Sequence, residues 1–370
     1  MSAVRTITSA EHREFLRQLP SASFLQTPAW GRVKPEWRAE SVGWYDGQRL
    51  VGAGLVLYRE APRIGRSLAY LPEGPLLDWT GPDLADSLLG LTTHVRQQGA
   101  FGVRMGPPVL RRRWQAATVK KAVAEASHRR LGDVPADEQA PDAERVAAVL
   151  RTQGWRPVTS GGGFGLGQPA FVFQLPLAGR SEDDVLAGMN QQWRRNIKKA
   201  AKAGVEVSRG SPPDLPAFHA LYAETARRDG FVPRPLAYFE LMFTALLEEE
   251  PDRIRLYLAR HEGDLVAATT WVRVGTHAWY SYGASSTAKR EVRGSNAIQW
   301  QMIRDAIAAG AKVYDLRGIT DTLDDSDPHF GLIQFKLGTG GQAVEYLGEW
   351  DLPISRLLYK AFDVYLRRRS

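Results

Sequence analysis

The sequence of 370 residues contains no cysteine, so the protein cannot form a disulfide or bind a metal through a thiolate. It also contains no run of about 20 apolar residues, the length that a membrane-spanning helix needs. The N-terminal segment MSAVRTITSAEHREF lacks the apolar core of a secretory signal. These absences predict a cytoplasmic globular protein.

Two kinds of reactive centre are missing as well. No Gly-x-Ser-x-Gly motif provides a serine nucleophile. The seven histidines are scattered without a pair at ligand spacing, and the acidic loop from Asp321 to Asp327 lacks the spacing of a calcium loop. We therefore expect no metal ion, no cofactor and no covalent enzyme intermediate.

What the sequence does contain is an excess of positive charge. The net charge is +7 and the pI about 9.6, on an ordinary globular composition with 44% hydrophobic residues. A basic chain favours anionic partners such as nucleic acid, nucleotide-linked substrates or acidic membranes, although net charge alone fits a protein without such partners equally well. The length favours more than one domain, because single cores stop growing at roughly 250–300 residues.

The order of predicted elements repeats once along the chain. Residues 41–59 predict two strands joined at Asp46-Gly47, and residues 255–274 predict a similar hairpin joined at Glu262-Gly263. Each hairpin precedes a strand (67–74 and 277–285), a helix ending at a glycine (83–99 and 295–310) and a last strand (100–105 and 311–318). This repetition predicts an α/β protein of two tandem domains with mixed sheets.

The middle of the chain is less regular. Residues 111–130 and 142–157 predict helices, and a glycine-rich connector at 159–170 suggests a domain boundary. A strand at 171–177 and one helix at 181–204 open the second half. We place the first domain at 1–168 and the second at 169–349, and we expect a C-terminal helix within 350–370 to pack on the first domain.

Four segments resemble motifs of the Fem family of peptidoglycan bridge-forming aminoacyltransferases. In chain order they are FLQTPAWGRVK (24–34), WRRNIKKAAKAGV (193–205), RRDGFVPRPLAYF (227–239) and DLRGI with FGLIQFKLGTGG (315–341). The resemblance implies two tandem domains of the acetyltransferase-like (GNAT) fold, the first for the acceptor and the second for catalysis and the aminoacyl-tRNA. No sustained heptad pattern is present, so we expect no inserted coiled coil, as in FemX-like members.

This resemblance implies transfer of an amino acid, glycine or another small residue, from aminoacyl-tRNA to the position-3 side-chain amine of a peptidoglycan precursor. The acceptor is UDP-MurNAc-pentapeptide or lipid II, and a lipid-linked acceptor would bring the protein, which we expect to be a monomer, to the inner membrane face. The reaction is aminolysis of an ester, so the catalyst must align two substrates and stabilise an oxyanion.

Lys336 is the first candidate for the catalytic group. The resemblance places Phe335 and Lys336 at the family's catalytic Phe-Lys pair, and an ammonium group suits a developing oxyanion. We expect the apolar residues around Lys336 to form a strand, followed by a flexible glycine-rich run at 338–341. The pattern alone favours a lysine exposed to water, whereas the resemblance favours one held inside a site.

Lys34 and Arg234 are the candidates for binding the phosphates of the acceptor, and Trp30 joins them as a substrate-binding residue. Lys34 ends the motif that contains Trp30, and Arg234 lies between two prolines ahead of a predicted helix. A lysine offers phosphate a point charge and an arginine a planar fork. The residues alone favour ordinary surface cations, and the resemblance favours binding.

Two tyrosines complete the expected substrate site. Tyr238 lies one helical turn after Arg234, so the two residues should share a face. Tyr280 and Tyr282 alternate along a predicted strand and should point to one side of the sheet, where such pairs usually pack. The resemblance favours Tyr282, and not Tyr280, as a site residue.

A basic helical surface is the candidate region for tRNA. It comprises Arg194, Arg195, Lys198, Lys199 and Lys202, and a second basic segment runs from Arg111 to Arg130. Such surfaces neutralise phosphates regardless of base sequence. They fit a solvated helix face or contact with anionic lipid headgroups as well.

One position departs from the family pattern, and two other functions stay open. The family commonly has Asp-Pro after the last strand of the first domain, where this chain has Gly106-Pro107, so no carboxylate can be assigned there as a base. An acyl-CoA-dependent N-acyltransferase would need a phosphate-binding turn of the form Arg/Gln-x-x-Gly-x-Gly/Ala. At the two ends of this motif the chain has Glu291 and Asn296, which do not fit it. A non-catalytic RNA-binding protein fits the basic helices, but no RNA-binding signature is present.

Overall fold

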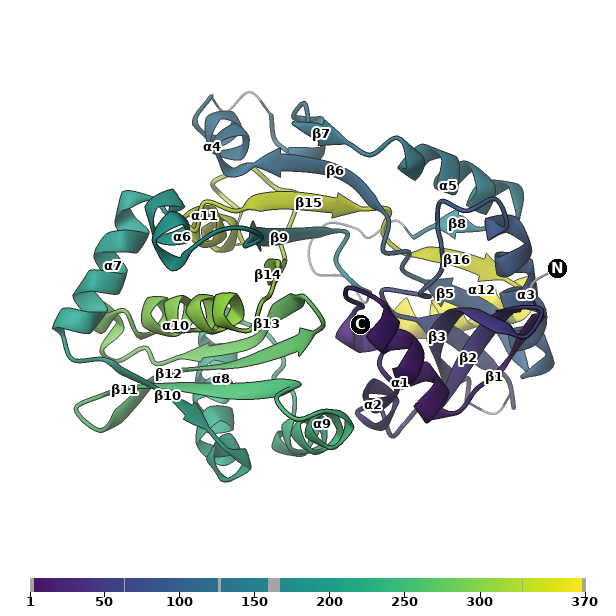
Figure 1. Ribbon diagram of the computed structural model, residues 1–370, viewed down its shortest axis with the longest axis horizontal. Coiled ribbons are helices and arrows are strands. Elements are labelled where there is room, and N and C mark those ends of the chain that lie inside the picture. Colours follow the sequence, from purple (N-terminus) through teal and green to yellow (C-terminus); the bar gives the residue numbers. More distant parts are fainter. Residues whose placement is uncertain (1–2, 63, 126–127, 159–166, 328, 368–370) are drawn as a thin grey trace. The chain divides into compact units, whose positions relative to one another are not determined.

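The structure is a computed structural model that describes residues 3–62, 64–125, 128–158, 167–327 and 329–367 (Figure 1). The chain divides into two compact units. The first comprises residues 1–113, 138–171 and 344–370, and the second comprises residues 114–137 and 172–343. Residues 159–166 of the expected glycine-rich connector lie outside the described residues. None of the described helices combines the length and the apolar character that crossing a membrane requires.

The first unit is built on one mixed sheet of seven strands. In spatial order these are β1 (Ala3–Thr6), β2 (Arg38–Asp46), β3 (Arg49–Glu60), β4 (Ser67–Leu71), β5 (Ala100–Met105), β16 (Trp350–Pro353) and β8 (Arg156–Pro157). Its helices are α1 (Ser9–Gln18), α2 (Pro28–Arg32), α3 (Leu84–Gln97), α5 (Asp142–Thr152) and α12 (Arg356–Arg367). Trp44, Leu88, Val103 and Trp350 belong to the buried core between the sheet and α3 and α5.

The second unit contributes six consecutive strands to the other mixed sheet. In spatial order these are β10 (Glu206–Gly210), β11 (Ile254–His261), β12 (Asp264–Val274), β13 (His277–Ser285), β14 (Val313–Gly318) and β9 (Phe171–Pro176). The helices are α4 (Ala116–Glu125), α6 (Glu182–Gly188), α7 (Gln191–Lys202), α8 (Leu215–Asp229), α9 (Leu236–Glu249), α10 (Gly294–Ala308) and α11 (Phe330–Leu337). The chain passes between the units within β6 (Leu110–Gln115), just before the short β7 (Glu138–Gln139), and within β9 and β15 (Gln342–Tyr346). Strand β7 pairs with β6.

The repeat predicted from the sequence is confirmed. The antiparallel hairpin β2–β3 is followed by β4, α3 and β5, and the hairpin β11–β12 is followed by β13, α10 and β14. The pairs β4–β5 and β13–β14 are parallel, so each helix is a crossover between parallel strands. The longest described helices, α8 and α10, have 15 residues each, so no long coiled coil is present in the described part of the chain.

The division of the chain differs from the expected boundaries at two segments. Residues 114–137 belong to the second unit, where Leu131 N donates to the Asp321 carbonyl at 2.7 Å. Within this segment, the Trp114 indole nitrogen donates to the Val134 carbonyl at 2.9 Å. Residues 344–349 belong to the first unit, where Tyr70 Oη donates to Glu349 Oε1 at 2.6 Å. Sequence alone gave no signal for these long-range contacts.

Three predicted helices are wrong in part. The helix expected at 142–157 ends at Thr152, and residues 156–157 form strand β8. Residues 110–115 form strand β6 before α4 begins, since the side chains in this arginine-rich segment pair with acidic residues of other elements, such as Arg113 with Glu138 at 2.8 Å. The single helix expected at 181–204 is two helices, α6 and α7. The chain turns at Met189 and Asn190, and the Asn190 side chain caps α7 by accepting a hydrogen bond from Trp193 N at 2.8 Å.

The segment around Lys336 is helix α11, and not the expected strand. The glycine-rich run that follows is closely packed, and not flexible. A Cβ atom at Gly338 would overlap the Trp193 ring, and one at Gly341 would overlap the Gln174 carbonyl. Thr339 between them is fully buried. These glycines are therefore required by the close approach of neighbouring elements.

We predict that Gly338→Ala destabilises the protein by about 1–3 kcal/mol, because the added methyl group must displace the Trp193 ring. Gly331→Ala within α11 is the matched control, since a Cβ there meets nothing within 4 Å. The control should be neutral or stabilising by about 0.5–1 kcal/mol. Urea unfolding of both variants measures the difference, and equal stabilities would contradict the packing explanation.

Candidate active site

Lys336 is a buried amine at the centre of the second unit's candidate site. The residue is 3% exposed. Its Nζ atom donates to the carbonyl of Gly318 at 2.6 Å and lies 3.3 Å from the carbonyl of Arg317. Both carbonyls belong to the end of β14, whereas Lys336 lies on α11. A protonated lysine has three N–H groups, so one remains for a ligand when these two are occupied.

A turn at the end of β14 directs the carbonyls of Arg317 and Gly318 toward Lys336. Arg317 has a φ of 63°, which a residue with a side chain adopts at a cost. Asp315 stabilises this turn, because its Oδ1 atom accepts a hydrogen bond from Arg317 N at 2.6 Å. The Asp315 Oδ2 atom accepts from Gln174 Nε2 at 3.0 Å and lies 3.2 Å from His277 Nε2. Asp315 thus connects β9, β13 and β14 beneath the lysine.

Burial changes the proton affinity of the two charged groups. Desolvation lowers the pKa of Lys336 to about 7, with a further lowering by Arg317, while the charge of Asp315 opposes it. Burial alone would raise the pKa of Asp315, but the hydrogen bond and charge of His277 hold that pKa below its usual value. Lys336 is therefore poised between ammonium and amine at neutral pH, beside a carboxylate that stays ionised.

Aromatic rings hold α11 in place. Trp193 of α7 packs against Phe335 with 4.8 Å between ring centroids, and its indole nitrogen donates to the Phe335 carbonyl at 2.8 Å. The Phe335 side chain, next to Lys336 in the sequence, therefore contacts the first turn of α7. Sequence analysis identified Phe335 and Lys336 but gave no reason to expect Asp315, His277 or Trp193 as their supports.

A second group of expected residues comes together at α9 and β13. The Tyr238 and Tyr282 hydroxyl groups lie 3.0 Å apart, and the Arg234 guanidinium lies 5.4 Å from the Tyr238 ring centroid. Burial first, and then Tyr282, raise the pKa of Tyr238, so it is a neutral hydrogen-bonding group. The exposed Arg234 is held by its own carbonyl, which lies 3.0 Å from His219 Nε2. These three residues form one polar and aromatic cluster.

Tyr280 and Tyr282 do not share a face of the sheet as expected. Tyr282 pairs with Thr270 and Tyr280 pairs with Trp271, with a register shift between them. Ser281 is thus an extra residue on β13, and a bulge of this kind breaks the alternation of side chains. The bulge separates Tyr282, which contacts Tyr238, from Tyr280.

Lys34 and Trp30 lie together in the first unit. The Lys34 ammonium is 5.9 Å from the Trp30 ring centroid, and Trp30 is buried against Phe24. Lys34 follows Val33, the residue that caps α2, and its carbonyl accepts a hydrogen bond from Trp37 N at 2.9 Å, which fixes the turn. The role of both residues in binding the acceptor stays a prediction.

Gly106 lies beside a carboxylate that the sequence analysis missed. A Cβ atom at Gly106 would be 3.7 Å from Glu349 Cγ and 3.2 Å from Glu73 N. Burial raises the pKa of Glu349, although Tyr70 and Arg104 oppose the shift. Glu349 follows β15 far along the chain, so only the fold reveals that an acidic group lies next to Gly106.

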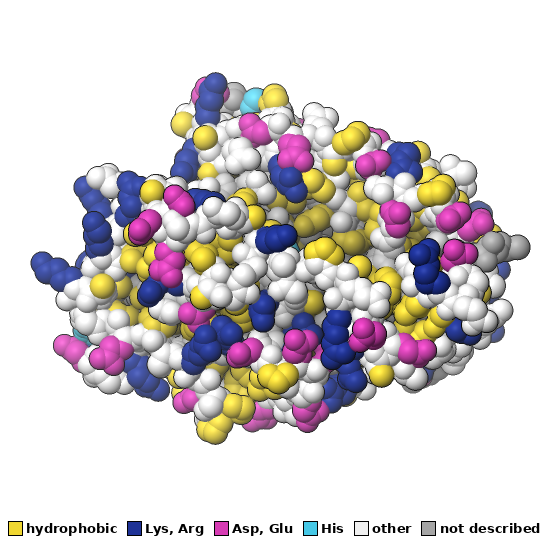
Figure 2. All heavy atoms as spheres, in the orientation of Figure 1, with side chains coloured by type: hydrophobic (Ala, Val, Ile, Leu, Met, Phe, Trp, Pro, Cys, Tyr) yellow, Lys and Arg dark blue, Asp and Glu magenta, His cyan; other side chains and the backbone are white. Residues whose placement is uncertain are grey.

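The basic surface of α7 is less uniform than expected. Figure 2 shows Lys and Arg side chains gathered over α7, at the left of the view. Arg195, Lys198, Lys199 and Lys202 are exposed. Arg194 instead donates to the carbonyls of Ala187 and Met189, each at 2.8 Å, and closes the end of α6. Four of the five candidates are therefore available to a ligand, and Arg194 supports the structure.

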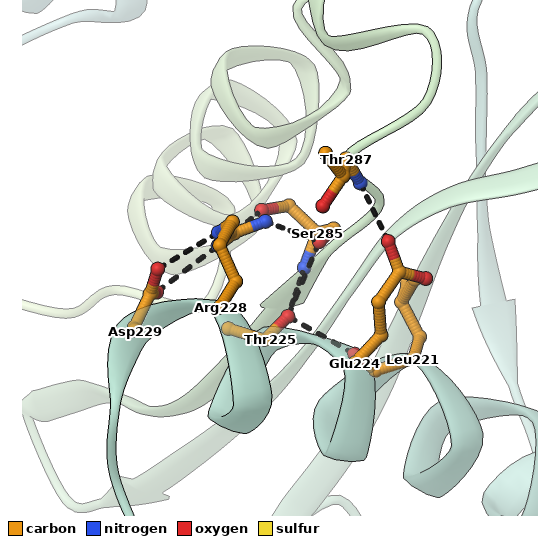
Figure 3. A network of polar contacts seen from close by, with 7 residues as sticks. All are labelled: Leu221, Glu224, Thr225, Arg228, Asp229, Ser285 and Thr287. Atoms are coloured by element: carbon orange, nitrogen blue, oxygen red, sulfur yellow. Dashed lines mark hydrogen bonds and ion pairs between the residues drawn. The ribbon is translucent and has the colours of Figure 1, made fainter.

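Helix α8 anchors the loop that follows β13 (Figure 3). Ser285 N donates to Thr225 Oγ1 at 2.9 Å, and Thr287 N donates to Glu224 Oε1 at 2.7 Å. Arg228 donates to the Ser285 carbonyl at 2.8 Å. The chain then enters α10 through Arg293, which has a φ of 63° and provides no side-chain cap.

The same segment contains Lys289, a cation shortly before the start of α10. Its ammonium lies 3.0 Å from Glu262 and 2.8 Å from Asp264, both on the β11–β12 turn. The lysine is therefore neutralised within the protein. This pairing does not favour a site for the phosphates of an acyl-CoA at the start of α10.

The FemAB family model matches residues 7–262 and 247–366, which together span most of the chain. The chain belongs to the FemAB family. Among curated relatives, the lipid II:glycine glycyltransferase of Staphylococcus epidermidis is 22% identical. The match covers 95% of this chain and 93% of that protein. The Staphylococcus aureus protein of the same name is 21% identical, with 96% of this chain and 94% of the relative covered.

Solved structures show the same fold for this FemAB-family chain. The structure of FemX superposes with a TM-score of 0.81 at 20% identity, over 97% of this chain and 99% of that one. A tandem GNAT protein from the clavulanic acid biosynthesis pathway gives a TM-score of 0.53 at 12% identity, over 96% and 99% of the two chains. The protein therefore has two GNAT-like domains, as the sequence predicted.

We predict that Lys336 titrates near pH 7, against about 10.4 for an ordinary lysine. Asp315→Asn should lower the pKa of Lys336 further, because the carboxylate favours the ammonium form. NMR of protein with ¹³C-labelled lysine side chains measures both values. Glu291→Gln, which removes an exposed carboxylate of the same unit, is the control. A Lys336 pKa near 10, or one unchanged by Asp315→Asn, would contradict the site as described.

Proposed function

We propose that the protein is an aminoacyl-tRNA-dependent transferase that adds an amino acid to the position-3 side-chain amine of a peptidoglycan precursor. Membership of the FemAB family and two relatives named lipid II:glycine glycyltransferase support a transferase of this class. The observation that carries the proposal is the buried Lys336, held by two backbone carbonyls with one N–H left over. Glycine or another small residue is the proposed donor amino acid.

Lys336 suits the charge that develops during aminolysis of an ester. The acceptor amine attacks the ester carbonyl and forms the C–N bond, so negative charge accumulates on the carbonyl oxygen. The ammonium form of Lys336 donates its free N–H to this oxygen, and the C–O bond to the ribose then breaks. The amine proton leaves to solvent or to the departing ribose oxygen, and no bond to the enzyme forms.

The protonation state of Lys336 responds to a negative charge placed next to it. Because burial lowers its pKa to about 7, the free enzyme contains both ammonium and amine forms at neutral pH. An oxyanion nearby favours the ammonium form, as any close negative charge does. The interaction is therefore stronger in the transition state than in the ground state, which is the condition for raising kcat.

The other predicted residues are assigned to binding. Arg234, with Tyr238 and Tyr282, offers one cation and two hydroxyl groups, which suits a phosphate-bearing acceptor. Lys34 and Trp30 are assigned to the same acceptor from the first unit. The exposed cations Arg195, Lys198, Lys199 and Lys202 are assigned to the tRNA backbone, where contacts depend strongly on salt.

We predict that Lys336→Met lowers turnover about 10²–10³-fold, because the oxyanion loses its donor. Binding of the acceptor should change little. The assay combines a set of charged tRNAs with soluble and lipid-linked precursors, and mass spectrometry identifies the product. Lys312→Met, an exposed lysine just before β14, is the control and should keep full turnover. Near-full activity of Lys336→Met, or transfer from acetyl-CoA in place of charged tRNA, would refute the proposal.

We predict that Arg234→Ala and Lys34→Ala each weaken acceptor binding about tenfold to hundredfold, the loss expected for one charge-assisted hydrogen bond. Titration calorimetry with the UDP-linked precursor measures the affinity. Arg227→Ala removes an exposed arginine of the neighbouring α8 and should bind as the wild type does. If both variants keep wild-type affinity, the two residues have no role in binding phosphate.

A further inference from the structure

A cavity of about 300 Å³ lies in the first unit, away from the residues assigned so far. It is lined by Arg151 at the end of α5, Trp155 and Arg156 at β8, Leu352 and Pro353 of β16, and Arg356 at the start of α12. Four structural elements therefore bring three guanidinium groups to one cavity whose other lining side chains are mainly apolar. Nothing in the proposed transfer reaction uses it.

The charge of this cavity is not balanced by acidic groups. None of the three arginines forms an ion pair with another described residue, and Arg151 only lies near the Trp350 ring, 5.6 Å from its centroid. Asp351 of β16 already binds Arg104 at 2.8 Å. The buried Trp155 indole nitrogen has no hydrogen-bond acceptor among the described residues. The three guanidinium groups thus present donors and positive charge, and they suit an anion such as a phosphate group.

Helix α12, which begins at this cavity, has two apolar sides. The inner side packs on β5, where Tyr359 and Phe362 contact Phe101 with ring centroids 6.5 and 5.2 Å apart. The outer side carries Leu357, 83% exposed, and Val364, 50% exposed. Seven residues are about two helical turns, so these two side chains lie on one face.

The combination of these features suits a membrane surface. Exposed apolar residues on a helix flanked by cations are typical of helices that lie in the headgroup region of anionic membranes. Arg356 and Lys360 flank Leu357 on α12 and are exposed. A single-stranded RNA would need exposed aromatic faces for stacking, but Trp155 is 2% exposed. The apolar stripe beside the arginines favours lipid over RNA.

We propose that the arginine cavity and the outer face of α12 bind an anionic phospholipid surface, with a lipid phosphate in the cavity and Leu357 and Val364 among the upper acyl carbons. This inference rests on the proposed function only in that a lipid-linked acceptor requires the enzyme to work at a membrane. The site would hold the first unit at the bilayer without any spanning helix. The ligand that the site binds is a phosphate diester attached to hydrocarbon chains.

Sedimentation of the full chain with vesicles tests the site. Vesicles of phosphatidylcholine are compared with vesicles that also contain phosphatidylglycerol. The wild type should bind the anionic vesicles more tightly. The triple variant R151Q/R156Q/R356Q should lose about 100-fold in partitioning, and L357S/V364S should lose about tenfold or more. The altered side chains are mostly at the surface, so thermal unfolding should show that the variants remain folded.

The matched control is R195Q/K199Q/K202Q, which removes three charges from α7 of the second unit. It should keep most of the vesicle binding. Equal binding by wild type and the arginine triple variant, or a larger loss in the α7 control, would overturn the inference. Loss of tRNA binding with vesicle binding intact in the triple variant would overturn it too. The assay contains neither substrate, so vesicle binding without any transfer activity would refute the proposed function alone.

Discussion

The contact between the Lys336 ammonium group and the carbonyls of Gly318 and Arg317 is the interaction on which the proposed chemistry depends. An amine buried to this extent is costly unless its protons have acceptors. The two carbonyls provide them, at 2.6 and 3.3 Å, and leave one N–H for the substrate. The same burial lowers the pKa of the lysine to about 7, so its charge responds to a nearby anion.

The surrounding fold holds this contact in place. Asp315 secures the turn at Arg317, and Trp193 secures α11 through the Phe335 carbonyl. The glycines after α11 allow the chain to pass close to the Trp193 ring and the Gln174 carbonyl. The catalytic candidate therefore depends on β9, β13, β14 and α7, elements that are distant from Lys336 along the chain. Repetition of the GNAT-like layout gives the first unit a similar frame that carries different side chains.

The sequence predicted what depends on local pattern. Asp-Gly and Glu-Gly turns marked both hairpins, and glycines marked the ends of α3 and α10. The motifs around Trp30, Arg234 and Lys336 pointed to the FemAB family, which the family model then matched. Predictions failed where distant contacts decide the outcome. Examples are the strand β6, which is fixed by ion pairs, the helix α11 and the bulge at Ser281.

The sequence did not reveal the contacts of some site residues. Asp315 begins DLRGI, a segment that resembles a family motif, but nothing in that segment points to Lys336, and Glu349 follows a strand far from Gly106. Only the fold brings Asp315 beneath Lys336 and Glu349 beside Gly106. Conversely, Arg194 matched a basic stripe, yet one of its guanidinium nitrogens donates to the carbonyls at the end of α6. The sequence predicted which residue types could take part in the chemistry, but it did not predict which group each side chain contacts.

The most direct test of the account is a crystal structure of the enzyme with a stable tetrahedral analogue of the aminoacyl ester under attack. The account predicts that Lys336 Nζ lies about 3 Å from the oxygen that represents the oxyanion, while still donating to the Gly318 carbonyl. An analogue bound with that oxygen out of reach of Lys336, and held by other donors, would contradict it.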